Sequence, residues 1–298
     1  MTILVTGSAG HLGAALMRRL RADRAPARGL DVRASEETDH IGSIADRGLV
    51  RAAMAGVRAV LHTATLHKPQ LATRSKQDFI DVNVTGTLVL LEEAVRAGAQ
   101  AFVFTSTTSA YGDALSPPPD APAAWVTEET VPVPGTIYGV TKLAAEKLCV
   151  LAHREHGLPV VVLRTARFFA GADGAADDLE PANLHLNELL ARRVDLDDAV
   201  EAHLAALRQA PALGFGRYVV SATTPFAPED CAALRRDAPA VVRRLFPDCE
   251  RLYASRGWRL FPTLDRVYVN AAARRDLGWR PRVDFGAALA RLALASGR

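Results

Sequence analysis

The sequence predicts an α/β protein with a parallel sheet that carries helices on both faces. Short apolar runs alternate with helical patterns through the first half of the chain, and parallel strands need such crossovers. A glycine-rich turn, Gly7 to Gly13, joins the first apolar run to the first helical pattern. With 298 residues, about half of them apolar, the chain can bury the core that this fold needs.

The individual elements follow from spacing. Leu12, Leu16 and Leu20 recur every four residues, which predicts a helix over residues 11–22. We expect further helices over residues 82–98 and 138–156. We expect strands over residues 3–6, 59–63, 101–106 and 160–164, and a weaker strand that ends at Asp31. Six prolines within residues 116–134 exclude a helix or a central strand there, so this segment is predicted to be a surface loop or lid.

After about residue 170 the alternation loosens. We expect a helix over 194–208, a strand over 217–221 that returns to the sheet, a partly helical stretch over 231–246 and a terminal helix over 287–295. The sequence therefore predicts one domain over 1–170 and a smaller one over 171–298, with 194–221 returning to the first domain.

Composition argues against several classes of protein. A formal net charge of +3 with scattered basic residues predicts no nucleic-acid partner. No apolar run approaches the roughly 18 residues of a membrane span, and the chain starts directly in a strand, so we expect a cytoplasmic protein with no membrane contact. Cys149, Cys231 and Cys249 lack metal-ligand spacing, which predicts reduced thiols and no metal site.

The turn Gly7-x-x-Gly10-x-x-Gly13 follows a strand and opens a helix, as a dinucleotide site requires. A chance glycine cluster in an Ala- and Gly-rich chain is the alternative. Asp31, 18 residues after Gly13, can accept hydrogen bonds from ribose hydroxyls and would repel a 2′-phosphate, which favours NAD over NADP. Arg33 instead favours NADP, because a guanidinium can bind the 2′-phosphate. Asp31 can alternatively be a solvated turn residue with no role in binding.

Tyr138 and Lys142 lie on one face of the predicted helix. The lysine charge, beside a cationic nicotinamide, favours the phenolate and is expected to lower the tyrosine pKa. The phenolate can then take a proton from a hydroxyl while hydride leaves the same carbon. The alternative is an ordinary helix with an exposed lysine. Hydroxyls of residues 105–109, at a strand end, can bind the substrate oxygen, although most will cap local backbone.

Over roughly residues 1–285 the chain resembles the extended short-chain dehydrogenases/reductases of the NAD-dependent epimerase/dehydratase family. The similar segments, in order, are Thr6-Gly7-Ser8-Ala9-Gly10-His11-Leu12-Gly13, Leu30-Asp31, Val60-Leu61-His62-Thr63-Ala64, Val82-Asn83-Val84-Thr85-Gly86-Thr87, Phe104-Thr105-Ser106-Thr107, Tyr111-Gly112, Tyr138-Gly139-Val140-Thr141-Lys142, Val194-Asp195-Leu196-Asp197-Asp198-Ala199 and Leu277-Gly278-Trp279-x-Pro281. The resemblance implies a Rossmann-like doubly wound sheet, with NAD bound by 1–170 and substrate mostly by a small C-terminal subdomain.

The resemblance also implies roles. Thr107, Tyr138 and Lys142 are expected to be catalytic, and Asn83 is expected behind the site, supporting the proton network. The expected cofactor-binding residues are Gly7, Ala9, Gly10, His11, Leu12, Gly13, Asp31, Arg33, Ser43, Ile44, Ala64, Asn83, Tyr138 and Lys142. The expected substrate-binding residues are His67, Thr107, Thr108, Arg167 and Arg193. Ser43 replaces the aspartate that the family usually carries near the adenine. His62 and His67 flank a loop that can touch substrate, or His67 is simply solvated.

Three departures from the family pattern bear on the substrate. Thr108 and Ser109 stand where dehydratases carry acids, so we do not expect water elimination. Arg167 stands where sugar-nucleotide epimerases carry an asparagine that helps hold the diphosphate. About 30 residues separate Arg164 from Val194, which is short for a nucleotide-diphosphate pocket. Arg167 with Arg192 or Arg193 can instead bind a carboxylate or phosphate.

We therefore predict an NAD-dependent oxidoreductase that transfers hydride at a carbinol or carbonyl carbon of a small sugar-like or hydroxylated substrate. A nucleotide-sugar 4-epimerase with tightly bound NAD is the alternative, and a non-catalytic dinucleotide sensor is a third hypothesis. The apolar helices over 82–98 and 138–156 make a homodimer through these helices plausible.

Overall fold

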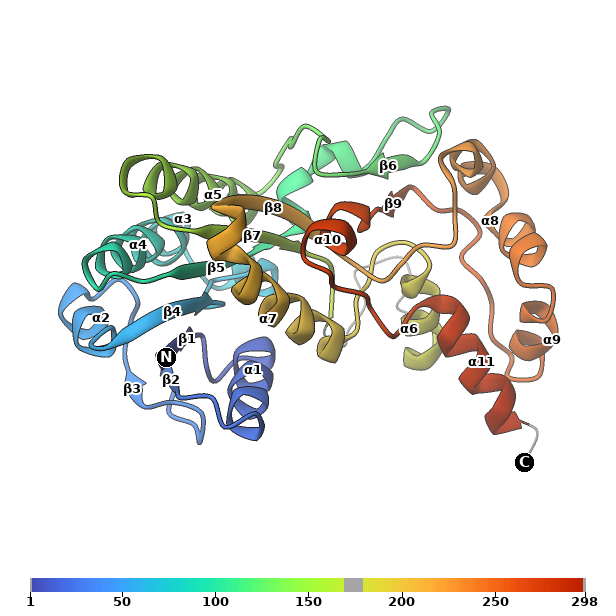
Figure 1. Ribbon diagram of the computed structural model, residues 1–298. Helices are drawn as coiled ribbons and strands as arrows, with labels where there is room; N and C mark the ends of the chain where they lie inside the picture. The colour runs from blue at the N-terminus through green and yellow to red at the C-terminus, as the bar shows by residue number, and fades with distance from the viewer. Residues whose placement is uncertain (1, 169–178, 297–298) are drawn as a thin grey trace.

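A computed structural model describes residues 2–168 and 179–296, and within them a sheet of parallel strands forms the body of the protein (Figure 1). Its strand order is β3-β2-β1-β4-β5-β7-β8. The strands are β1 (Thr2–Thr6), β2 (Ala27–Asp31), β3 (His40–Ile41), β4 (Val57–His62), β5 (Ala101–Thr107), β7 (Val160–Thr165) and β8 (Phe215–Val220). Because the strand order reverses direction between β1 and β4, this is a doubly wound Rossmann-like sheet, as predicted.

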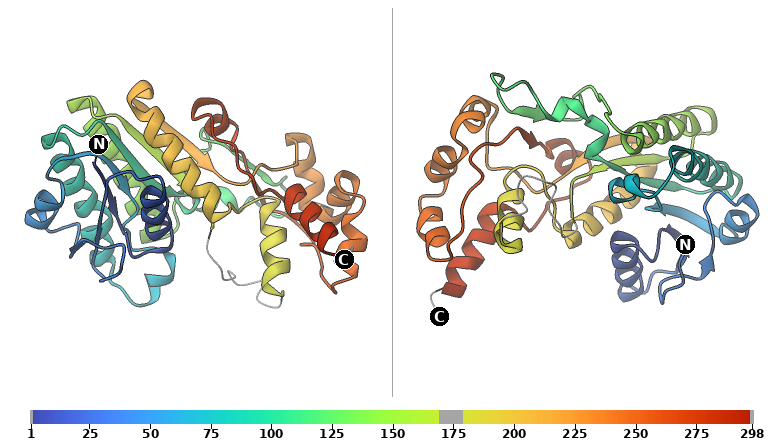
Figure 2. Two further views of the ribbon diagram at one scale, coloured as in Figure 1. Left: turned by 60° about the horizontal axis from the view of Figure 1, so that its bottom comes forward. Right: turned by 180° about the vertical axis from the view of Figure 1, so that it is seen from behind.

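Helices cover both faces of this sheet (Figure 2). On one face lie α1 (His11–Ala22) and α7 (Leu196–Leu213), packed over a cluster that includes Leu16, Leu61 and Leu204. On the other lie α2 (Arg47–Ala53), α4 (Gly86–Arg96) and α5 (Ile137–His156), over a cluster that includes Leu90 and Phe102. Helix α1 has the bounds that its leucine spacing predicts. The predicted helix over 82–98 starts instead as a π-helical turn, η2 (Ile80–Thr85), preceded by α3 (Lys76–Phe79).

The C-terminal helices enclose a separate hydrophobic cluster that includes Leu186, Leu234 and Phe285. They are α6 (Pro181–Leu189), α8 (Cys231–Leu245), α9 (Cys249–Ala254) and α11 (Phe285–Ser296). Helix α10 (Ala271–Asp276) instead contributes Ala273 to the cluster under α1 and α7. Helix α8 is kinked at Asp237, two residues before Pro239, which explains why its pattern is only partly helical. Short 3₁₀ helices complete the described chain: η1 (Lys68–Ala72), η3 (Thr108–Tyr111), η4 (Asp113–Leu115) and η5 (Pro228–Asp230).

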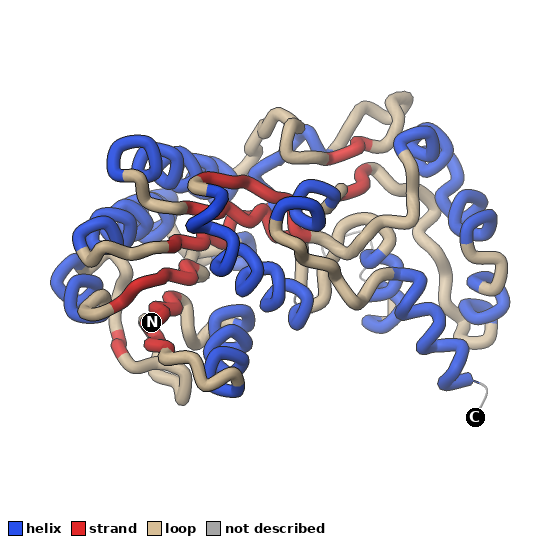
Figure 3. Tube along the Cα trace, viewed as in Figure 1, coloured by secondary structure: helices blue, strands red, loops and turns tan. Residues whose placement is uncertain are grey.

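The proline-rich segment is less irregular than predicted. Its proline-free centre forms β6 (Ala124–Val126), which pairs with β9 (Arg266–Tyr268) in a small parallel sheet beside the main one (Figure 3). This pairing ties the segment to the C-terminal part of the chain. Strand β8 pairs with β7 along its whole length, so the predicted return of the chain to the sheet occurs. The predicted domain boundary at residue 170 lies outside the described residues.

Two further expectations concern the whole chain. No helix in the described ranges is both long and apolar enough to span a bilayer. Cys149, Cys231 and Cys249 are all buried and unpaired.

Candidate active site

The glycine-rich turn brings backbone segments unusually close together. Gly7 has a φ of 72°, and a Cβ there would lie 2.7 Å from the Ala64 backbone nitrogen. A Cβ on Gly13 would lie 2.0 Å from the Gly7 carbonyl oxygen, so only glycine lets α1 pack against the turn. The α1 N-terminus has no side-chain cap, because its N-cap is Gly10. Its backbone N–H groups and the positive end of its dipole therefore remain available to an anion.

Asp31 is hydrogen-bonded to this turn. The buried carboxylate accepts hydrogen bonds from the backbone nitrogens of Ala9 at 3.0 Å and Arg33 at 2.9 Å. The exposed Arg33 side chain donates to the Ala9 carbonyl at 2.8 Å and lies 3.7 Å from the carboxylate. Asp31 and Arg33 thus lie together at the end of β2, beside the turn.

Ser43 and Ile44 have mainly local contacts. The Ser43 hydroxyl accepts a hydrogen bond from the Ala45 backbone nitrogen at 3.1 Å. Ile44 is buried against Gly86, where a Cβ would come within 2.6 Å of the isoleucine side chain. Ile44 therefore packs the start of α4 against the sheet.

Asn83 connects the loop after β4 to the helix that carries Tyr138. Its side-chain oxygen accepts from the Thr65 hydroxyl and from the Leu66 backbone nitrogen, at 2.9 and 2.8 Å. Its side-chain nitrogen donates to the Leu66 carbonyl and to the Thr141 hydroxyl, at 2.9 and 3.1 Å. Asn83 therefore fixes the position of a loop that starts at Ala64, and its π-helical turn brings the amide to that loop.

Tyr138, Thr107 and Lys142 come together where β5 ends and α5 begins. All three are buried, and the Tyr138 phenol is hydrogen-bonded to the Thr107 side chain. The Lys142 ammonium donates to the Thr105 carbonyl at 2.6 Å and lies 4.1 Å from the centre of the Phe104 ring. Thr136 is the N-cap of helix α5, and its hydroxyl accepts a hydrogen bond from the Gly139 backbone nitrogen, so Tyr138 lies in the first turn of the helix.

Burial changes the proton affinities of this pair in a direction that the sequence does not predict. It raises the Tyr138 pKa to about 12, against the lowering expected from Lys142, while the hydrogen bond with Thr107 acts in the opposite direction. Burial also lowers the Lys142 pKa to about 7, and ionisation of the neighbouring Cys149 and Glu146 side chains would act in the opposite direction. Desolvation of the Tyr138 phenolate and of the Lys142 ammonium therefore outweighs the attraction between these two charges, from which the lower tyrosine pKa was expected.

His203 holds Thr105 from the opposite face of the sheet. Its Nδ1 lies 2.7 Å from the Ala199 carbonyl, which can only accept, so Nδ1 carries the proton. Its Nε2 therefore accepts from the Thr105 hydroxyl, at 2.8 Å. Burial lowers the His203 pKa to about 4, which keeps the ring neutral at pH 7. His203 could not be assigned to this site from the sequence, because no spacing of residues in the sequence places α7 against β5.

The residues predicted to bind substrate fall into separate groups. Thr108 is hydrogen-bonded to the Tyr268 side chain of β9. Arg193 donates to the buried carboxylate of Glu188 at 2.6 Å, and Arg167 lies 3.8 Å from the same carboxylate. Arg192 also pairs with Glu188, at 3.3 Å. The protein itself therefore supplies one carboxylate to the three guanidinium groups predicted to bind an anion.

The two histidines of the β4 loop have different environments. His62 is buried between the hydroxyls of Thr6 and Thr87, at 2.7 and 3.0 Å, so its side chain lies in the core. His67 precedes η1 and is half-buried. Burial, and secondly the charge of His11, lower its pKa. His67 therefore lies near the start of α1.

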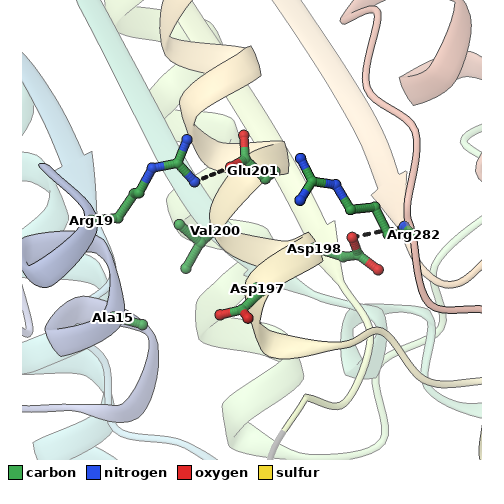
Figure 4. A pocket seen from close by; sticks show the side chains of 7 residues that line it. All are labelled: Ala15, Arg19, Asp197, Asp198, Val200, Glu201 and Arg282. Carbon is green, nitrogen blue, oxygen red and sulfur yellow. Dashed lines mark hydrogen bonds and ion pairs between the residues drawn. The ribbon is translucent and has the colours of Figure 1, made fainter. Parts of the chain in front are cut away.

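One cavity, of about 270 Å³, lies between α1 and α7 (Figure 4). Arg19 and Glu201 form an ion pair across it, and none of the predicted site residues lines it. Within the described residues there is no cluster of potential metal ligands.

Comparison with known proteins gives one family match, to the NAD-dependent epimerase/dehydratase family over residues 3–220. UDP-glucose 4-epimerase of Erwinia amylovora is 36% identical over 172 residues, which cover 50% of this chain and 47% of that protein. dTDP-glucose 4,6-dehydratase of Streptomyces antibioticus is 27% identical over 332 residues, covering 98% and 91%. The chain spans about half the length of the first curated relatives that it matches.

A solved structure of a short-chain dehydrogenase/reductase superfamily protein from Agrobacterium tumefaciens, with bound NAD, has a similar fold. Its TM-score is 0.70 with 24% sequence identity, and the match covers 100% of this chain and 97% of that one. At this level of identity the similarity concerns the arrangement of helices and strands.

Proposed function

Because the chain belongs to the NAD-dependent epimerase/dehydratase family, we propose that it is an NAD-dependent oxidoreductase. It acts at a carbinol or carbonyl carbon of a small sugar-like or hydroxylated substrate. The observation that carries the proposal is the buried Tyr138 phenol, hydrogen-bonded to Thr107 and one helical turn from the Lys142 ammonium. These groups stand at the carboxyl edge of the sheet, where open α/β sheets bind ligands.

In this proposal the chain's own residues bind and deprotonate the substrate hydroxyl. Thr107 orients the substrate oxygen, and the Tyr138 phenolate takes its proton. Since burial raises the Tyr138 pKa to about 12, the phenolate needs positive charge nearby, and Lys142 supplies it. Bound NAD would accept the hydride, or return it in the reverse reaction.

The residues present fit a dinucleotide. A side chain at Gly7 or Gly13 would collide with neighbouring backbone, so the tight turn can form only with glycine at both positions. A turn of this kind, without side chains, lets a pyrophosphate approach the backbone closely. In the proposed site it is held by Gly7, Ala9, Gly10, His11, Leu12 and Gly13, with Asp31, Arg33, Ser43, Ile44, Ala64 and Asn83 around the adenosine and nicotinamide halves. The Asp31 carboxylate beside the turn favours NAD over NADP because it would repel a 2′-phosphate.

We further propose that the substrate carries an anionic group. Arg167, Arg192 and Arg193 lie 3.8, 3.3 and 2.6 Å from the Glu188 carboxylate, so the chain gathers in one place three guanidinium groups of the kind that recognise carboxylates and phosphates. Arg167, together with Arg192 or Arg193, is the proposed anion-binding group. Thr108 and His67 complete the proposed substrate contacts, with residues after 178 forming most of the substrate-binding subdomain.

The experiment is a search for NADH formation, followed at 340 nm, with sugar acids, sugars and hydroxyacids as substrates. We expect turnover with at least one anionic substrate. Replacing Tyr138 with Phe should lower kcat/KM by about 10²–10⁴-fold without loss of folding. Tight NAD binding without turnover on any substrate would contradict the proposal, and an unchanged function of Y138F would indicate a dinucleotide sensor.

The similarity to a UDP-glucose 4-epimerase supports the alternative of a nucleotide-sugar 4-epimerase. In that reaction hydride leaves and returns, so NAD should stay bound through purification and no net NADH should appear. Measuring NAD released on denaturation of the purified protein distinguishes the two reactions.

We also propose a cytoplasmic homodimer. The buried, unpaired cysteines are compatible with a reducing compartment. Leu88 of α4 and Val140 and Leu151 of α5 are large apolar side chains that are 37%, 47% and 46% exposed. Apolar residues exposed on two neighbouring helices are typical of a surface that another subunit covers.

A further inference from the structure

A second buried polar cluster lies directly behind the catalytic group, between α5 and the sheet. Its centre is Glu146, which is 1% exposed. The Glu146 carboxylate accepts from the Ser106 hydroxyl at 2.6 Å and from Arg164 Nε and Nη2 at 3.0 and 2.8 Å. Arg217 Nε lies 3.2 Å from the same carboxylate. Three adjacent strands, β5, β7 and β8, thus each direct one polar side chain at one residue of α5.

The placement of these groups follows from the sheet. Ser106 and Arg164 are cross-strand partners in the parallel pairing of β5 and β7, so their side chains lie on the same face. Both oxygens of Glu146 are bonded, as a buried carboxylate requires. The two-pronged geometry of Arg164 on Glu146 also restricts the orientation of the carboxylate.

This cluster touches both segments that carry the catalytic group. Glu146 comes one helical turn after Lys142 and two turns after Tyr138 on α5. Ser106 stands between Thr105, whose carbonyl binds the Lys142 ammonium, and Thr107, which is hydrogen-bonded to Tyr138. The Glu146 carboxylate therefore joins the middle of α5 to the end of β5.

We propose that Glu146 is a positioning residue for the proposed active site: it fixes the β5 end through Ser106 and supplies the negative charge that keeps Lys142 protonated. The inference rests on the proposed function for its catalytic meaning. Its physical content, a carboxylate that controls the charge of a buried lysine, can be measured on the free protein.

The electrostatic surroundings of Lys142 are consistent with this role. Burial lowers its pKa to about 7, and Cys149 and Glu146 are the neighbouring groups whose ionised forms would raise it. Burial raises the Cys149 pKa beyond the physiological range, so that thiol is neutral and Glu146 is the anion that acts. The other titratable or charged groups facing this region from α5, β4, β7 and β8 are Tyr138, His62, Arg164 and Arg217.

The test is the Lys142 titration, followed by NMR of protein labelled at its lysine side chains. The chain has four lysines, at 68, 76, 142 and 147, so the Lys142 signal is assigned by its loss in K142M. In E146Q the Lys142 pKa should fall by about one unit or more, because an opposite charge is lost. R217M disturbs the same cluster but removes a positive charge, so in this variant the Lys142 pKa should not fall.

The matched control is E93Q. Glu93 is also buried and paired with arginines, Arg47 and Arg51, but it lies on α4 away from the catalytic group. The same chemical change there should leave the Lys142 titration unchanged. An unshifted Lys142 pKa in E146Q, or an equal fall in R217M or E93Q, would overturn the electrostatic role.

S106A tests the positioning role without changing any charge, and it remains informative if E146Q does not fold. It should leave the Lys142 titration unchanged and lower kcat at least about tenfold, with KM little altered. In E146Q the alkaline limb of the pH profile should move down with the Lys142 pKa. Full kcat in S106A would overturn the positioning role. If no substrate is found, the proposed function fails, and the lysine titration still decides the charge role of Glu146.

Discussion

At the scale of the residue, Gly7 shows how the absence of a side chain allows the glycine-rich turn to form. Gly7 and Gly56 have nearly the same backbone, with φ of 72° and 71°. They differ in their surroundings: a Cβ on Gly7 would meet the Ala64 nitrogen at 2.7 Å, whereas a Cβ on Gly56 meets nothing within 4 Å. The two glycines therefore separate backbone strain from close packing.

We expect G56A to cost about 1 kcal/mol, the strain of a left-handed non-glycine residue. G7A should cost clearly more and weaken NAD binding roughly tenfold or more, because about 1.4 kcal/mol of misfit is a factor of ten. Urea unfolding measures the first quantity and isothermal calorimetry with NAD the second. Equal effects of the two substitutions would show that the turn does not need its close approach to Ala64.

Lys142 predicts a dependence of stability on pH. Its pKa is lowered from 10.5 to about 7 in the folded protein, so between these values the unfolded chain binds more protons. The free energy of unfolding contributed by Lys142 therefore rises with pH from about 7 to 10.5. Below pH 7 the buried ammonium destabilises the fold fully, on the order of a few kcal/mol at about 1.4 kcal/mol per pKa unit.

K142M should consequently be more stable than the parent protein at pH 6.5 and lose part of its advantage by pH 9. Urea unfolding at both pH values measures this. K147M is the control, since Lys147 is exposed on the same helix and should leave the pH dependence unchanged. A K142M protein that is less stable at pH 6.5 would mean that the ammonium stabilises the fold.

At the scale of the element, α7 anchors the C-terminal segment. The buried Asp198 carboxylate accepts from the backbone nitrogens of Arg282 and Val283, at 2.8 and 2.9 Å. Its own carbonyl accepts from the Trp279 ring nitrogen at 3.0 Å. Two segments that the resemblance names separately, Val194–Ala199 and Leu277–Pro281, are thus one structural unit.

D198A should lower the free energy of unfolding by about 1–3 kcal/mol, because two partly buried backbone donors lose their acceptor. D197A removes the same group from the neighbouring, exposed position and should cost less than about 0.5 kcal/mol. Thermal or urea unfolding compares the two. Similar losses would show that the effect comes from the helix dipole and not from the anchor.

The contrast between elements explains what sequence alone could predict. Helix α1 and the strands of the sheet's interior have strong periodicity or continuous apolar runs, so their positions were predictable. Strand β6 has three residues inside a proline-rich segment, and its partner β9 lies about 140 residues later, so no local pattern marks it. Its existence depends on tertiary pairing.

The site divides in the same way. Tyr138 and Lys142 share a helix face, so spacing alone joins them. Glu146 shares that face as well and could have been found by extending the same spacing one more turn. The pairing of Glu188 with Arg192 and Arg193 is local in sequence, with Arg192 at the i,i+4 position, whereas its approach to Arg167 depends on the tertiary fold. The raised Tyr138 pKa was equally unpredictable, since it depends on burial.

At the scale of the whole molecule, the neighbouring helices α4 and α5 leave large apolar side chains partly exposed to solvent. Helices α4 and α5 pack against each other over the sheet, yet Leu88 and Leu151 on them remain 37% and 46% exposed (Figure 1). Burial of apolar area is the main favourable term in association, at about 25 cal/mol per Å². A second copy of the same helices would cover these residues symmetrically.

We therefore expect a particle of twice 31.9 kDa in light scattering after size exclusion. The double substitution L88D/L151D should shift it to the monomer, since a buried interface does not tolerate unpaired carboxylates. V131D is the control: Val131 is 73% exposed in the proline-rich segment and belongs to neither α4 nor α5, so this substitution should leave the dimer intact. A parent protein that is monomeric at micromolar concentration would show that this face is covered by something other than a second copy, or not at all.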